Sequence, residues 1–470
     1  MPETASKRSR AYVYLVAFIA AAGGFNWGYD VILMSGAILF MKSSFNIGGM
    51  NFVLFSHTFG GAWIEGFTMT SAIYGILVGM LVGGRLADRI GRKRTLILAA
   101  LLLIVAAIGT TVPRTLSLWN VFRIMGGIGG GLASLVSPMY ISEIAPADRR
   151  GSLVTFNQLA IVLGAFMANL STFVVAKYLG SNPECWRWMF GSACPPIFIF
   201  LLGLFLIPES PRWLVMNHRA EDASAILTQI GGKENAERAI QEISQDLGQE
   251  TGTYRELIQP GVRIALLIAL GLALFQQLVG VSPLIYYAPE IFVKAGISSN
   301  ASAIGNTVIL RVGDILWTLF AIFGVDKFGR RPLLLVGTLG VTLGQLLMGL
   351  CFSNHSTPLS LLLVFFLCEA AYGFSLAPLA WLISTELFPT RLRARGMSIA
   401  AFVMLGSGLV LAQIFPPMLE FFRRHFSSEA GAFWVYAVFG VAAFLFSFFA
   451  VVETKGKTLE QIAASYAGWR

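Results

Sequence analysis

Long apolar stretches make up most of this chain, and they limit its fold more than any single motif does. Of its 470 residues, 56% are hydrophobic and 13% are charged. A helix needs about 20 apolar residues to cross the roughly 30 Å hydrocarbon core of a bilayer. Twelve such membrane-spanning helices are predicted, at 12–40, 67–87, 95–112, 117–141, 152–177, 187–207, 263–292, 301–325, 332–353, 359–385, 396–420 and 430–452. The sequence therefore predicts an all-α membrane protein.

The basic residues are distributed unevenly between the loops. The formal net charge is +9, and most Lys and Arg residues lie before the first span and in every second loop after it. Because cytoplasmic loops are enriched in Lys and Arg, both termini and the loop at 208–262 are predicted to be cytoplasmic. The positive charge thus follows from membrane topology, with lipid as the surroundings, and nucleic acid is not expected as a partner.

The second half of the chain repeats motifs of the first half. Gly-Arg-Leu-Ala-Asp-Arg-Ile-Gly-Arg-Lys-Arg at 84–94 returns as Val-Asp-Lys-Phe-Gly-Arg-Arg at 325–331, and Ser-Glu-Ile-Ala-Pro at 142–146 returns as Thr-Glu-Leu-Phe-Pro at 385–389. The common offset of roughly 240 residues indicates two six-helix halves related by duplication. The predicted domains are an N-terminal half at 1–207, a cytoplasmic helical linker at 208–262, a C-terminal half at 263–452 and a cytoplasmic tail at 453–470.

Several motifs together resemble one transporter family. They are Gly83 to Arg94, Pro208 to Leu214, Gln276-Gln277-Leu278-Val279-Gly280 with Tyr286-Tyr287-Ala288-Pro289, and Glu386 to Pro389. In this order and at these spans they resemble the sugar porter branch of the major facilitator superfamily, over nearly the whole chain. The resemblance implies a secondary transporter of a sugar or polyol with the twelve-helix major facilitator fold, in a bacterial inner membrane. It implies no enzymatic activity; we expect a monomer without cofactor or metal.

Charged residues inside the predicted spans are the first candidates for function. Asp30, Arg123, Arg311, Asp314 and Glu369 lie well within them, where a charge costs about 2.5–3.5 kcal/mol on insertion scales. Three acids face two bases, so at least one carboxyl group must be protonated or change partners. This surplus is a candidate site for a transported proton.

The resemblance assigns proton coupling to the first of these acids. Gly28-Tyr29-Asp30 on the first span and Arg123 before a glycine run on the fourth span are similar to the pattern of bacterial proton-coupled sugar porters. Asp30 would carry the proton, and Arg123 would be its alternating partner. A static ion pair is the competing interpretation.

The resemblance also implies a set of substrate contacts. Amides supply both a donor and an acceptor for sugar hydroxyls, and tryptophans supply apolar ring faces. The implied contacts are Trp27, Gln158, Gln276, Gln277, Ser282, Asp314 and Trp381. Ser282 and Asp314 stand where the family has Asn, so the substrate is left open between a monosaccharide and a polyol. A proton-coupled organic-anion symporter and a facilitative sugar uniporter are the alternatives.

Arg311, Asp314 and Glu369 form a possible ionic set in the C-terminal half. Arg311 and Asp314 are three residues apart on one helix face, which is close enough to interact. The set has three interpretations: a structural network, a site for a charged or polyol substrate, and a second proton site.

Acidic and basic residues gather at the predicted cytoplasmic helix ends. As a cytoplasmic gate they would form ion pairs that break when the halves separate, and the simpler interpretation is that the arginines only set topology. The predicted gate residues are Asp88, Arg89, Arg92, Glu143, Arg150, Asp326, Arg330, Glu386 and Arg395.

Overall fold

The computed structural model describes residues 7–54, 57–146, 149–248, 253–259, 262–354, 356–457 and 461. Nearly all of them are helical. The exceptions include a short antiparallel hairpin of β1 (Phe52–Leu54) and β2 (His57–Phe59), in which Val53 pairs with Thr58. The predicted all-α fold is therefore confirmed.

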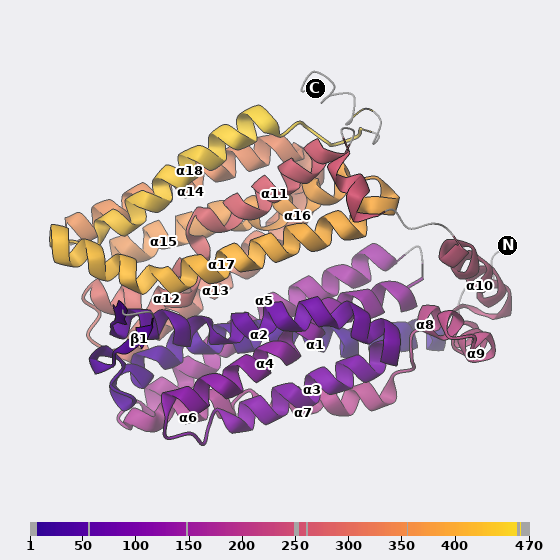
Figure 1. Ribbon diagram of the computed structural model, residues 1–470, viewed down its shortest axis with the longest axis horizontal. Coiled ribbons are helices and arrows are strands. Elements are labelled where there is room, and N and C mark those ends of the chain that lie inside the picture. The colour runs from indigo at the N-terminus through magenta and orange to yellow at the C-terminus, as the bar shows by residue number, and fades with distance from the viewer. Residues whose placement is uncertain are drawn as a thin grey trace. The chain divides into compact units, whose positions relative to one another are not determined.

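The chain divides into two compact units, and Figure 1 shows each as a bundle of long helices. Unit 1 comprises Met1–Ala37, Ser71–Val175 and Glu184–Glu250, and unit 2 comprises Ile38–Thr70, Ala176–Pro183 and Thr251–Arg470. The first half of the chain supplies α1 (Lys7–Ser44), η1 (Ile47–Gly49), α2 (Gly61–Ile90), α3 (Arg92–Gly109), α4 (Leu116–Ile144), α5 (Arg150–Leu179), η2 (Pro183–Cys185), α6 (Trp186–Gly191) and α7 (Cys194–Leu206). The second half supplies α11 (Arg263–Leu278), α12 (Val281–Lys294), α13 (Asn300–Phe328), α14 (Arg330–Ser353), α15 (Pro358–Gly373), α16 (Leu376–Leu387), α17 (Thr390–Phe426) and α18 (Ala430–Ala450).

Glycines allow the helices of unit 1 to approach closely. A Cβ atom on Gly127 of α4 would lie 2.0 Å from the carbonyl oxygen of Ala72 on α2. Such small residues let helix backbones meet in a membrane, where packing and not water exclusion drives association. The glycine run at 126–131 therefore serves helix packing, as its position inside an apolar span predicts.

Two spans of unit 2 are interrupted. The predicted span at 263–292 consists of α11 and α12, separated at Gly280, whose φ of +78° suits glycine. A Cβ atom there would also lie 2.2 Å from the Tyr436 ring. The span at 359–385 is divided in the same way into α15 and α16. Discontinuous helices of this kind often form the binding sites of transporters.

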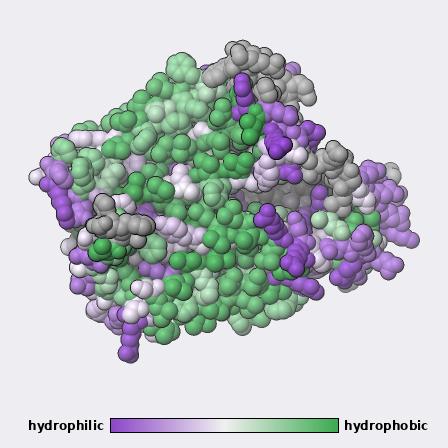
Figure 2. Space-filling view, viewed as in Figure 1, coloured by the Kyte–Doolittle hydropathy of each residue, from purple (hydrophilic) through white to green (hydrophobic). Residues whose placement is uncertain are grey.

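Eleven helical segments are long and apolar enough to cross a membrane among the described residues. The twelfth predicted span, 95–112, corresponds to α3, which is 18 residues long and begins with Arg92, Lys93 and Arg94. These basic residues leave α3 an apolar run at 95–109 only. In Figure 2 hydrophobic residues cover the middles of the helices in each unit, and hydrophilic residues gather at the ends.

The predicted helical linker contains three short helices and a 3-10 turn. They are α8 (Pro211–Met216), α9 (Ala220–Gly231), α10 (Lys233–Gly248) and η3 (Tyr254–Ile258). Trp213 and Leu214 of α8 pack against Ala223 of α9 in a small buried cluster.

Candidate functional site

Asp30 and Arg123 form an ion pair inside unit 1. Nη1 of Arg123 lies 2.5 Å from Oδ1 of Asp30, and Nη2 donates to the Asp30 carbonyl oxygen over 3.2 Å. The Arg123 side chain is 4% exposed and that of Asp30 is 16% exposed. Asp30 is therefore less buried than its partner.

Aromatic rings hold the guanidinium of Arg123 in place. Its central carbon lies 5.3 Å from the ring centroid of Phe190 and 5.8 Å from that of Trp119. A cation over an aromatic face is attracted by the ring quadrupole. Arg123 thus has support that does not depend on Asp30, which makes a temporary loss of the carboxylate partner tolerable.

The predicted amides of unit 2 lie beside its interrupted helices. Nε2 of Gln276, near the end of α11, donates to the carbonyl oxygen of Ala377 in the first turn of α16 over 3.0 Å. Oε1 of Gln277 accepts from the Ser282 hydroxyl over 2.6 Å across the Gly280 break. Polar side chains thus lie together where the two predicted spans are interrupted.

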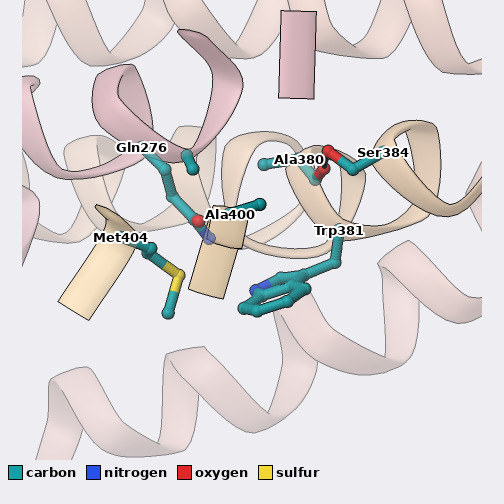
Figure 3. Close-up of a pocket in the computed structure, with 7 residues that line it drawn as sticks. Gln276, Ala380, Trp381, Ser384, Ala400 and Met404 are labelled. Atoms are coloured by element: carbon teal, nitrogen blue, oxygen red, sulfur yellow. Dashed lines mark hydrogen bonds between the residues drawn. The ribbon is translucent and has the colours of Figure 1, made fainter. Parts of the chain in front are cut away.

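An open pocket of about 170 Å³ lies next to these amides. It is lined by Ala273, Gln276, Ala380, Trp381, Ser384, Ala400 and Met404. Figure 3 shows the amide of Gln276, the thioether of Met404 and the indole of Trp381 around the same space. The pocket therefore combines one amide with an aromatic ring, which suits a sugar's hydroxyl groups and its apolar ring face.

Two further predicted substrate contacts, Trp27 and Gln158, belong to unit 1, whereas Asp314 belongs to unit 2. Trp27 of α1 is half-buried against Gly130 of α4, and Gln158 of α5 is exposed. Close contact between Gly28 and the Ile161 backbone joins α1 to α5. The same helix pair thus carries both predicted contacts and the acid Asp30.

Arg311, Asp314 and Glu369 come together in unit 2. Nη1 of Arg311 contacts Asp314 on the same helix, and Nη2 contacts Glu369 of α15. Arg311 and Glu369 are almost fully buried, with side chains 4% and 2% exposed, whereas the Asp314 side chain is 22% exposed. Two carboxyl groups thus share one guanidinium.

Three of the predicted gate residues of unit 1, Asp88, Arg92 and Glu143, form one ionic cluster at the junction of α2 and α3. Arg92 makes a bidentate contact with Glu143, in which Nε and Nη2 each lie 2.9 Å from a carboxylate oxygen. Nη1 of Arg92 lies 3.1 Å from Asp88. Arg89 is exposed, and the side chain of Arg150 lies outside the described residues.

Unit 2 contains the equivalent contact. Nη2 of Arg330 lies 3.1 Å from Glu386, whose second oxygen accepts from the Thr454 hydroxyl over 2.5 Å. The guanidinium of Arg395 lies over the Tyr254 ring. The side chain of Asp326 lies outside the described residues.

Sequence reasoning missed an ionic cluster in unit 2, which we call the outer cluster. Nζ of Lys42 lies 2.7 Å from Glu65 and 2.8 Å from Glu290, and Nζ of Lys294 lies 3.4 Å from Glu290 and 3.1 Å from Glu429. Lys42, Lys294 and Glu429 stand near helix ends, so in the sequence they look like ordinary loop charges. A signal was available in Glu65 and Glu290, which lie inside apolar helices.

No group of His, Cys, Asp and Glu side chains that could hold a metal ion occurs in the part of the chain that the structure describes.

Comparison with known proteins connects this site to a family. Residues 16–466 match the family model described as sugar (and other) transporter. The chain is 35% identical to the D-xylose-proton symporter of Escherichia coli, over 97% of this chain and 96% of that protein. It is 34% identical to the arabinose-proton symporter of Bacillus subtilis, over 98% and 96%.

A solved structure agrees with this relationship. The inward-open conformation of the xylose transporter XylE from E. coli matches 97% of this chain and 100% of that chain with a TM-score of 0.83 and 33% identity. The protein is a multi-pass membrane transporter, not an enzyme, and it belongs to the sugar porter family of the major facilitator superfamily.

Proposed function

We propose that this protein carries a monosaccharide together with a proton across a bacterial inner membrane, by alternating access of its two helical halves. The observation that carries the proposal is the ion pair of Asp30 and Arg123 inside a membrane helix bundle. An ionisable residue at this depth is a functional site by default. The related xylose-proton and arabinose-proton symporters support the same coupling.

The proton would bind Asp30 when Arg123 moves away. A carboxylate near a guanidinium is stabilised in its ionised form, and a buried carboxylate without a cation favours the protonated form. Loss of the contact over 2.5 Å would therefore load the proton, and its return would release it. The neutral, loaded carrier could then change its orientation.

The sugar would bind to Gln276, Gln277, Ser282 and Trp381 in unit 2. Trp27 and Gln158, which belong to unit 1, stay predicted substrate contacts. The 170 Å³ of this pocket includes space that is open to the surroundings, so only a small part of it is enclosed. It would hold one part of the sugar. An organic anion fits less well, because both terminal nitrogens of Arg311 already contact protein carboxylates.

The gate clusters around Arg92 and Arg330 would lie on the cytoplasmic side, with both termini. The basic residues that follow α2 and α13 support this orientation. We also propose that the domains end at residues 207, 262 and 452 and that the protein is a monomer.

Uptake into proteoliposomes tests this function. The purified chain would be assayed with a panel of pentoses, hexoses, polyols and sugar acids, with and without an inward proton gradient. We expect at least one monosaccharide to accumulate only with the gradient. Asp30→Asn should let that sugar equilibrate without accumulating, whereas Asp222→Asn, at an exposed ion pair of the linker, should behave as the unaltered protein. Accumulation by Asp30→Asn would overturn the coupling role.

A further inference from the structure

The buried cluster of Arg311, Asp314 and Glu369 carries an unbalanced charge. With both carboxyl groups ionised, its net charge would be −1 inside the membrane part of unit 2. Carboxylates that share one site do not both remain ionised when a single positive charge faces them. The cluster therefore needs one more positive charge.

Among the described residues of the helices that pack most extensively around the cluster, no cation lies beside it. The helices packed most extensively against α13 and α15 are α12, α14 and α16, and α13 itself has Lys327 only in its last turn. Their other charged residues lie near the helix ends: Glu290, Lys294, Arg330, Arg331 and Glu386. The remaining titratable groups near the cluster are Cys368, Tyr286 and Tyr372, none of them cationic.

One carboxylate oxygen in this cluster also has no partner. Oε1 of Glu369 accepts from Arg311, whereas Oε2 is buried and makes no hydrogen bond among the described residues. An ionised oxygen in that position would be costly. A protonated one would remove the excess charge.

We propose that the Arg311–Asp314–Glu369 cluster binds an exchangeable proton on Oε2 of Glu369, separate from the proton on Asp30. The proton joins the carboxylate oxygen without breaking any other bond, and Oε1 keeps its contact with Arg311. Asp314, with a side chain 22% exposed, is the least buried member of the cluster. A contribution of this proton to transport rests on the proposed symport, whereas its binding does not.

Infrared difference spectroscopy of the full chain in lipid, recorded over a pH series, tests the proton directly. We expect a protonated-carboxyl band that grows as the pH falls, and we expect part of it to disappear in Glu369→Gln. Asp314→Asn should remove the same part, because one carboxylate then faces one guanidinium. Asp30→Asn and Glu65→Gln are controls in which the Glu369 component remains. An unchanged band in Glu369→Gln, or a component that does not vary with pH, would overturn the proposal.

If Glu369→Gln does not fold, Asp314→Asn provides the same comparison. A transport measurement separates this site from the proposed function. The sugar gradient that just balances a known proton gradient gives the number of protons per sugar, and we expect Glu369→Gln to lower that number by one. If the unaltered protein does not couple to protons, the proposed function fails, while the infrared result still decides the proton on Glu369.

Discussion

Glu453 accepts a hydrogen bond from the backbone N–H of Arg330 over 3.0 Å, as Glu209 accepts one from Arg92 over 2.9 Å. Each carboxylate thereby caps the first turn of a helix, α14 or α3, that follows a glycine with positive φ. A negative charge at this position satisfies free N–H groups and complements the helix dipole. The two halves of the chain, which repeat each other in sequence, thus also share this capping contact.

Removal of this cap should destabilise the protein only above acidic pH. Burial alone would raise the pKa of Glu453, but backbone N–H groups, including those of Lys455, Arg330 and Arg331, outweigh it and lower the pKa. A lowered pKa in the folded state gives stability that is present above the ordinary Glu value of about 4.3 and is lost as the pH falls through the lowered value. We expect Glu453→Gln to reduce the thermal midpoint by about 1–2 °C at pH 7.

The difference between the two proteins should shrink as the pH falls below about 4. Lys457→Gln, which changes an exposed charge in the same segment, is the control and should leave the midpoint unchanged. An equal effect of Glu453→Gln at pH 7 and at acidic pH would show that the charge of the cap is unimportant.

In the outer cluster, loss of the shared cation Lys42 should lower the stability of the protein. Lys42→Met would leave Glu65 and Glu290 facing each other without the amine that both contact. Removing one partner of a buried ion pair costs about 3–5 kcal/mol, and the partial exposure of Lys42 places this case at the lower end. We therefore expect the variant to unfold at a lower temperature at neutral pH, as thermal denaturation in detergent would measure.

A second change should restore part of this loss. Lys42→Met combined with Glu65→Gln removes one negative charge along with the positive one and leaves Glu290 in contact with Lys294. We expect the double variant to be more stable than Lys42→Met alone. If the two variants unfold at the same temperature, the charges of the outer cluster do not interact as the geometry indicates.

Much of the fold and part of the site follow from the sequence alone. Apolar length predicts the spans, and a spacing of three residues predicts the Arg311–Asp314 contact. The contact of Arg311 with Glu369, 58 residues away, depends on how helices pack, which spacing does not reveal. The break at Gly280 was also missed, because its cause includes the Tyr436 ring on another helix.

The glycine crossing of α2 and α4 gives a test of packing. A methyl group on Gly127 would lie 2.0 Å from the Ala72 carbonyl oxygen, so the helices must separate to admit it. Overpacking of this kind costs about 1–3 kcal/mol. We expect Gly127→Ala to lower the unfolding temperature, whereas Gly84→Ala on α2, with no atom within 4 Å of the added carbon, should not. Equal stability of both variants would contradict the close crossing.

Substitutions of two buried glutamines of unit 2 should have different effects, one on sugar binding and the other on the stability of the protein. Gln276 lines the pocket beside Trp381 and has a carbonyl oxygen that can accept from a sugar hydroxyl. Gln345 of α14 lies outside the pocket lining and donates to the Val279 carbonyl oxygen at the helix break over 2.8 Å. A hydrogen bond worth about 1–1.5 kcal/mol corresponds to roughly a tenfold change in affinity.

We expect Gln276→Ala to weaken sugar binding about tenfold with unchanged proton coupling, measured by tryptophan fluorescence titration and by uptake. Gln345→Ala leaves a buried carbonyl oxygen without its donor, so it should lower stability by about 1–3 kcal/mol and keep the sugar affinity. Since both changes remove the same amide from the same unit, a loss of affinity in both variants would mean that Gln276 acts through the helix break and not through the sugar.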